Sequence, residues 1–186
     1  NLLPLATFAL DTYGSDPCAC FQLKGANACS PSETELNIRM HKAISIIQFK
    51  VEGQIIKEHP EFCLEDRNLL HRIDLDKGTI LLEGGEQEML DSHFPTMDPA
   101  DPYRLTAEEN AIMERLAAAF QNCEKLQQHM RFLLAKGSLY KVYNGNLLYH
   151  GCIPLNRDGS FKEVDIYGQN YKGKSLYECL GGYVRK

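Results

Sequence analysis

The sequence predicts a mixed α/β fold in which a mainly helical region, residues 1–137, precedes a β-rich region, residues 138–186. Two observations predict this order. In the first region, apolar residues recur at helical spacing behind capping-box sequences. After Ser138, apolar and polar residues alternate, and the turn signal Asn144-Gly145 separates two strand-like runs.

Length and composition are those of an ordinary globular protein. The chain has 186 residues, of which 44% are hydrophobic and 24% charged, enough to bury a core and to exclude a disordered chain. No apolar run is long enough to cross a bilayer. With 20 basic against 25 acidic residues and no long basic run, the chain is a poor match for nucleic acid or an anionic membrane. We expect neither as a partner.

The cysteines predict a reducing compartment. There are seven, an odd number, and no signal peptide precedes them, so a secreted disulfide framework is not expected. The one cluster, Cys18-Ala-Cys20 with Cys29, lacks the paired spacing of a structural zinc site. We therefore expect reduced, mostly structural cysteines in a cytoplasmic protein.

The first helices follow from proline, glycine and capping signals. Pro4 suits a first turn, and the helix that it opens can end at Gly14. After a loop over residues 14–31, the capping box Ser32–Glu35 opens a long helix that Pro60 ends. One apolar stripe runs along this helix, formed by Leu36, Met40, Ala43, Ile47 and Val51.

Shorter elements follow the long helix. We expect a helix over Glu61–His71, a strand over Thr79–Leu82, and, after the turn Gly84-Gly85, an extended run over Gln87–Leu90. Residues 94–103, with three prolines and two aspartates, should be irregular.

A second capping box, Thr106–Glu109, opens a heptad-spaced stripe that ends at Gly137. A parallel coiled coil, and with it a homo-oligomer, would use this stripe. Alanine and cysteine pack weakly at seam positions, which favours an intramolecular helix pair. The stripe consists of Ile112, Leu116, Ala119, Cys123, Leu126, Met130 and Leu133.

The β-rich region begins with a hairpin. Its strands run over Leu139–Tyr143 and Asn146–Tyr149. A turn at Arg157–Gly159, a strand over Phe161–Tyr167 and a helix over Ser175–Val184 follow.

Residues 168–175 match the P-loop pattern letter for letter. A nucleotide-binding P-loop also needs a later strand that ends in an aspartate for Mg²⁺, and no aspartate follows Ser175. The preceding run Glu163–Tyr167 alternates polar and apolar residues, unlike a central parallel strand. We therefore expect a hairpin that turns into a helix capped near Lys174.

Two further candidates concern metal binding. Asp91-Ser-His93 places a carboxylate and an imidazole where both could hold one cation, but no further ligand motif follows, so we interpret both as loop residues. His150 ends the apolar run Leu147–Tyr149 and precedes Gly151, an arrangement that suits a ligand at a sheet edge. By position alone a structural histidine is the commoner interpretation.

Taken together, the strand and His150-Gly151 are similar to a metal motif of calcineurin-like metallophosphoesterases, and the chain resembles the class III fructose-1,6-bisphosphatases of bacteria. The resemblance covers most of the chain. It rests on the stretches Asn1–Leu10, Asp91–Asp98, Asp101–Ala107, His129–Ser138, Asn146–Pro154 and Asn170–Lys174.

This resemblance implies a phosphatase that hydrolyses fructose 1,6-bisphosphate in gluconeogenesis with a dinuclear metal site, usually of Mn²⁺. In such sites two metals lower the pKa of a bridging water and stabilise the phosphoryl oxygens during in-line attack. His150 would be a metal ligand, and Gly151 would keep the backbone close to the bound phosphate. A sugar bisphosphate would be the small-molecule partner.

The family's other metal motifs have no counterpart in this sequence. The resemblance therefore implies an internal fragment, a helical insertion followed by part of a calcineurin-like αββα sandwich, that is inactive by itself. The apolar ends of the chain, which opens without methionine, agree with this expectation. The alternative is a non-catalytic module that binds a partner through the stripe over residues 112–133.

Overall fold

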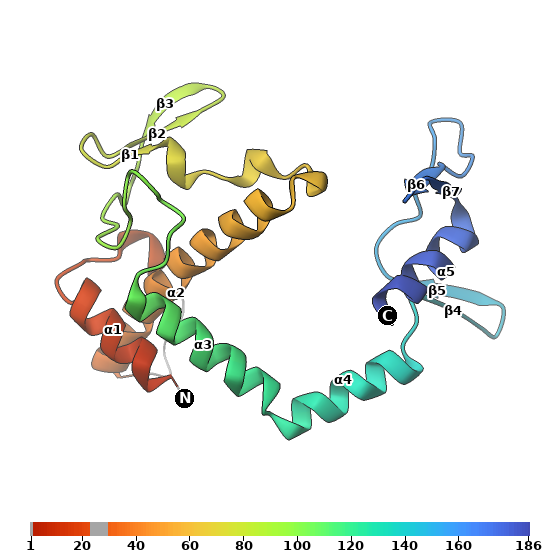
Figure 1. Ribbon diagram of the computed structural model, residues 1–186, viewed down its shortest axis with the longest axis horizontal. Helices are drawn as coiled ribbons and strands as arrows, with labels where there is room; N and C mark the ends of the chain where they lie inside the picture. The colour runs from red at the N-terminus through yellow and green to blue at the C-terminus, as the bar shows by residue number, and fades with distance from the viewer. Residues whose placement is uncertain (1, 23–29) are drawn as a thin grey trace. The chain divides into compact units, whose positions relative to one another are not determined.

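The computed structural model describes residues 2–22 and 30–186, so Cys29 lies outside the described residues. The chain forms two compact units, Asn1–Phe120 and Gln121–Lys186. Helices and antiparallel strands occur together, which confirms the mixed α/β class (Figure 1). Among the described residues, every helix is too short or too polar to cross a lipid bilayer.

The first unit is built on helix α1 (Leu3–Tyr13) and the long helix α2 (Pro31–Glu58), which pack against each other (Figure 1). Proline in the first turn starts α1, as expected. Arg39 of α2 donates from Nε to the Tyr13 carbonyl at 3.1 Å and from Nη2 to the Gly14 carbonyl at 3.0 Å. These bonds satisfy carbonyls at the end of α1 and tie it to α2.

The predicted capping box of α2 was wrong by two residues. Ser30 is the N-cap: its Oγ accepts from the Glu33 N–H at 3.3 Å, and the Glu33 carboxylate accepts from the Ser30 N–H at 2.8 Å. The same Ser-x-x-Glu pattern occurs at both places in the sequence. Pro31 decides between them, because its fixed φ and missing N–H suit the first helical position.

Short elements connect α2 to α3 (Ala107–Gln121). The helix expected over Glu61–His71 is instead a set of 3₁₀ turns, because Cys63 adopts a left-handed φ of 51° that interrupts a helix. The strand Thr79–Leu82 is confirmed as β2. It pairs with β1 (Ile73–Asp74) and β3 (Gly85–Glu88) in an antiparallel sheet of order β1-β2-β3. The 3₁₀ turns are η2 (Pro60–Phe62), η3 (Glu65–Arg67) and η4 (Leu70–Arg72).

The core of the first unit lies where α1, α2 and α3 meet. Buried apolar side chains from all three helices share one cluster: Leu5, Ala9, Tyr13, Ile38, Ala43, Ile47 and Ile112. The capping box Thr106–Glu109 is confirmed, with the Thr106 N–H donating to Glu109 at 2.8 Å and the Glu109 N–H donating to Thr106 at 3.2 Å.

The second unit contains α4 (Glu124–Lys136), the hairpins β4–β5 and β6–β7, and α5 (Gly173–Val184). The bounds of the strands are Tyr140–Tyr143 for β4, Asn146–Tyr149 for β5, Val164–Ile166 for β6 and Gln169–Tyr171 for β7. The first hairpin and the last helix are confirmed. The strand expected over Phe161–Tyr167 is shorter and covers only Val164–Ile166; it ends there because Tyr167 turns the chain with a φ of 51°.

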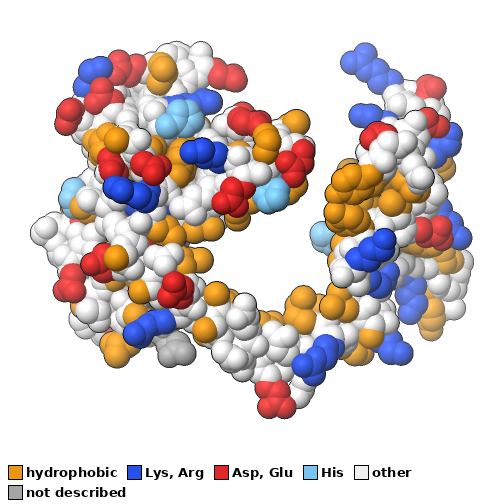
Figure 2. Space-filling model, viewed as in Figure 1, with side chains coloured by type: hydrophobic (Ala, Val, Ile, Leu, Met, Phe, Trp, Pro, Cys, Tyr) orange, Lys and Arg blue, Asp and Glu red, His pale blue; other side chains and the backbone are white. Residues whose placement is uncertain are grey.

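The second unit leaves much of its apolar surface exposed. On α5 only Gly173, Leu176 and Gly181 are buried. Figure 2 shows hydrophobic side chains gathered over this unit. The exposed apolar side chains include Phe132, Leu133, Val142, Leu147, Leu148, Phe161 and Val184.

Candidate functional site

His150 follows directly after β5, where the sequence placed it. The hairpin that carries it pairs Tyr140 with Tyr149, and it turns through Asn144 and Gly145 with φ of 49° and 75°. Positive φ at both turn positions matches the twist of the strands, which is why Asn-Gly is favoured there. The hairpin therefore fixes where the backbone of His150 emerges.

The surroundings of His150 are open. The residue is exposed, and Gly151 has a φ of 87° with no heavy atom within 4 Å of where a Cβ would stand. The Tyr177 hydroxyl of α5 donates to the Cys152 carbonyl at 3.0 Å, which anchors the segment after His150. An exposed imidazole at an anchored strand end can serve as a metal ligand.

The residues that the structure describes do not complete a metal centre. Within residues 2–22 and 30–186, no group of three or more histidine, cysteine, aspartate or glutamate side chains could hold a metal ion. His150 is thus a single candidate ligand, while a catalytic site needs at least three protein ligands per metal in the common zinc enzymes. The role of His150 stays a prediction.

Asp91 and His93 lie in the loop after β3, as the sequence analysis predicted. They belong to an ionic network around the fully buried Lys42 of α2. The Lys42 ammonium lies 2.6 Å from Asp16 Oδ2 and 2.7 Å from Asp91 Oδ1, and His93 Nδ1 lies 2.6 Å from Asp16 Oδ2. A lysine thus occupies the place between the two carboxylates where a cation would bind.

Asp16 is held in its charged form by this network. Burial by itself would raise its pKa, but hydrogen bonds from Lys42, His93 and the Cys18 N–H outweigh burial and lower the pKa to about 2. The carboxylate therefore stays ionised at neutral pH and forms an ion pair with Lys42. We assign this network a structural role, joining the segment after α1 and the loop after β3 to α2.

A second buried lysine on α2, Lys50, joins α2 to α3 through an ion pair. Lys50 Nζ donates to the Thr96 carbonyl at 2.7 Å and to the Glu109 carboxylate at 2.7 Å. Sequence reasoning missed both lysines. The signal that could have found them is their spacing, because Lys42, Ile46 and Lys50 repeat every four residues along the buried face of α2.

The P-loop match has the structure expected of a hairpin. Residues 169–171 form β7, Gly168 lies in the β6–β7 turn with a φ of 79°, and α5 starts at Gly173. The Lys174 ammonium lies 3.4 Å from the Glu178 carboxylate one turn further along α5. The chain therefore does not wrap around a phosphate here.

The apolar stripe over residues 112–133 is not one continuous helix. Cys123 adopts an extended conformation, with a φ of −78° and a ψ of 99°, and acts as the N-cap of α4. Asn122 and Cys123 have low helix propensity, which explains why the helix breaks there without glycine or proline. The heptad-spaced stripe is therefore divided between α3 and α4, while its predicted end at Gly137 is confirmed, because Gly137 is the C-cap of α4.

The cysteines within the described residues are all free of disulfides, as predicted: Cys18, Cys20, Cys63, Cys123, Cys152 and Cys179. Only Cys18 among them is buried, so most are not core residues. Burial, followed by the charge of Asp16, raises the pKa of the Cys18 thiol and keeps it protonated.

Comparison with known proteins identifies the family. A family model described as Firmicute fructose-1,6-bisphosphatase matches residues 1–186. The chain is 54% identical over 188 residues to fructose-1,6-bisphosphatase class 3 of Clostridium novyi (strain NT), covering 100% of this chain and 28% of that relative. For the protein of the same name from Listeria innocua the identity is 52%, covering 100% of this chain and 30% of the relative. For that of Parabacteroides distasonis it is 48%, covering 100% and 28%. No solved structure matches. The chain thus spans under a third of the length of these curated relatives, and over all of its residues it belongs to the Firmicute fructose-1,6-bisphosphatase family.

Proposed function

We propose that the protein to which this chain belongs hydrolyses fructose 1,6-bisphosphate to fructose 6-phosphate and phosphate, a step of gluconeogenesis. One observation carries the proposal: relatives named fructose-1,6-bisphosphatase class 3 align with the whole chain at about half identity. The substrate would be the small sugar bisphosphate, and the protein would work in the cytoplasm.

We further propose that residues 138–186 form part of the metallophosphatase domain and that residues 1–137 are a helical insertion. The exposed apolar surface of the second unit supports the first half of this proposal. Exposed valine, leucine and phenylalanine side chains on both strands and helices are unusual for a unit that stands alone, and they favour packing against further polypeptide. The curated relatives are long enough to contain such further polypeptide, because this chain covers only 28% of the first of them.

His150 would supply one ligand to a manganese centre, and the remaining ligands would come from other parts of the protein. Its exposure, its place at a strand end and the free space beside Gly151 support this role. Because the described residues offer no complete ligand set, this chain alone should release no phosphate from the substrate.

The test is phosphate release from fructose 1,6-bisphosphate with Mn²⁺, measured on the whole protein and its His150→Ala variant. His129→Ala is the matched control, because His129 is also exposed, on α4 of the same unit. We expect a loss of at least about a hundredfold in the first variant and none in the control. Manganese content per chain, measured on the same samples, should fall only in His150→Ala.

Each outcome is decisive. Full activity and full metal content in His150→Ala would refute the ligand role and leave the phosphatase proposal standing. Absence of metal-dependent release from the unaltered whole protein would refute the phosphatase proposal itself. Metal-dependent turnover by this chain alone would refute its predicted inactivity.

A further inference from the structure

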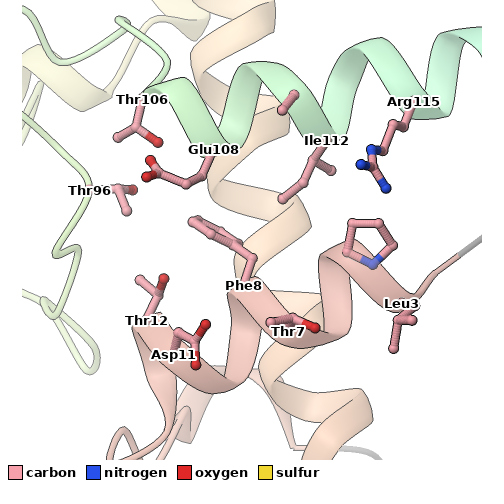
Figure 3. Close-up of a pocket in the computed structure, with 12 residues that line it drawn as sticks. Leu3, Thr7, Phe8, Asp11, Thr12, Thr96, Thr106, Glu108, Ile112 and Arg115 are labelled. Atoms are coloured by element: carbon pink, nitrogen blue, oxygen red, sulfur yellow. The ribbon is translucent and has the colours of Figure 1, made fainter.

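An open pocket of about 650 Å³ lies between α1 and α3 in the first unit. Figure 3 shows Phe8 of α1 and Ile112 of α3 in the middle of this pocket, where they give it an apolar surface. Ile112 belongs to the hydrophobic core cluster and Phe8 packs against this cluster, so the core holds both side chains in place. A concave, partly apolar site with a few charged groups at its edges is the usual form of a small-molecule site.

The charges around the pocket are separated by sign. Glu108 and Arg115 lie at opposite ends of the part of α3 that borders the pocket, and Asp11 of α1 lies on the other side of the Phe8 side chain from Glu108 (Figure 3). Among the residues that the structure describes, none of these three side chains has a hydrogen-bond or ion-pair partner. The adjacent Glu109 differs, because Lys50 and Thr96 both bind its carboxylate at 2.7 Å. The pocket therefore presents a cation and two anions that the described fold does not use.

Helix geometry gives the spacing of the two ends. Glu108 and Arg115 are seven residues apart on α3, which places them on one face and separates them by about 10 Å along the helix axis. On α1, Leu3 lies at the start of the helix and Asp11 near its C-terminal end (Figure 3). A ligand that used both ends would span about two helical turns.

We propose that this pocket binds a small, elongated zwitterion, with an ammonium group on Glu108, a carboxylate on Arg115, and methylene groups over Phe8. The planar guanidinium can bind a carboxylate through two parallel hydrogen bonds. An ammonium group has three donors and can bind the Glu108 carboxylate at the other end. The apolar carbons between the charges would be removed from water by the Phe8 ring. This proposal does not depend on the phosphatase activity.

The test uses 6-aminohexanoate as the probe, with binding to the chain measured by calorimetry. Hexanoate and hexylamine each lack one of its charges, and glycine carries both charges too close together. We expect 6-aminohexanoate to bind and each of the other three compounds to bind at least about tenfold more weakly, since each loses a charge-assisted contact.

Variants assign the two ends. Arg115→Gln should weaken 6-aminohexanoate about tenfold and leave hexylamine unchanged, whereas Glu108→Gln should weaken it and leave hexanoate unchanged. Glu114→Gln is the control, since Glu114 accepts from Asn110 at 2.9 Å and does not line the pocket. The side chains of Arg115 and Glu108 are exposed, so the fold should survive, which far-UV circular dichroism checks. Equal binding of hexylamine and 6-aminohexanoate, or no binding at roughly 10 mM probe, would overturn the proposal.

Discussion

Replacement of Lys42 by methionine tests the ionic network at the centre of the first unit. The ammonium is fully buried and lies within 2.7 Å of both Asp16 and Asp91. Methionine keeps the volume of the side chain but removes its charge. Two buried carboxylates would then lie close to each other without the lysine between them, and only the His93 imidazole would still contact Asp16. Any loss of stability therefore reports the electrostatics and not a cavity.

The magnitude follows from the same contacts. The Asp16 pKa falls from 3.8 to about 2, which corresponds to about 2 kcal/mol of stabilisation at neutral pH. Removing one partner of a buried ion pair costs about 3–5 kcal/mol in general. Because Lys42 serves a second carboxylate as well, we expect Lys42→Met to lower the free energy of unfolding by about 3–5 kcal/mol at pH 7.

The pH dependence has a defined sign. The folded pKa of Asp16 lies below its unfolded value, so its contribution is fully present above about pH 4 and is lost as the pH falls toward 2. In Lys42→Met the carboxylate loses its main cationic partner. The difference between the two proteins should therefore be largest near neutral pH and shrink between about pH 4 and pH 2.

Urea unfolding followed by far-UV circular dichroism measures the effect, because the chain contains no tryptophan. The triple variant Asp16→Asn, Lys42→Met and Asp91→Asn is the control, since it removes the charges together and should recover most of the loss. A loss below about 1 kcal/mol in Lys42→Met, or a loss that does not change with pH, would refute the reasoning.

Two further substitutions test packing and capping. Gly53→Ala should destabilise the chain by about 1–3 kcal/mol, because the new methyl group would overlap the Tyr103 ring. Gly84→Ala is the control, since its methyl group meets no atom within 4 Å and should change stability little. Thermal unfolding compares the two variants, and equal stability would contradict the packing argument. Ser30→Ala should cost about 1 kcal/mol and Ser32→Ala less than about 0.5 kcal/mol, since only Ser30 caps α2. A larger loss of stability in Ser32→Ala than in Ser30→Ala, measured by urea titration, would mean that Ser32 is the N-cap.

Local signals in the sequence determined the elements whose causes are local. Proline in the first turn, the Asn144-Gly145 turn and the Thr106–Glu109 box each act within four residues, and the structure confirms all three. The position of His150 at a strand end follows from the same hairpin. Where two local signals competed, as at the start of α2, the proline between them decided, and the pattern alone did not.

The tertiary structure decided what the buried faces contain. From sequence, a lysine on a helix is expected to be exposed to solvent, yet Lys42 and Lys50 are fully buried. They are buried because carboxylates distant in the sequence pair with them: Asp16 and Asp91 with Lys42, and Glu109 with Lys50. The residues next to these lysines in the sequence do not predict which carboxylates will pair with them. Burying a charge is favourable only when such partners arrive together, and their arrival depends on how loops and helices pack.

The same distinction holds for the sites. The sequence by itself determined the family of the chain, because long matching stretches are properties of the order of residues. The role of His150 as a metal ligand stays a prediction from a strand-end motif. The pocket between α1 and α3 was decided only by tertiary structure. Its lining residues come from helices about a hundred residues apart in the chain, and packing alone brings them to a shared surface.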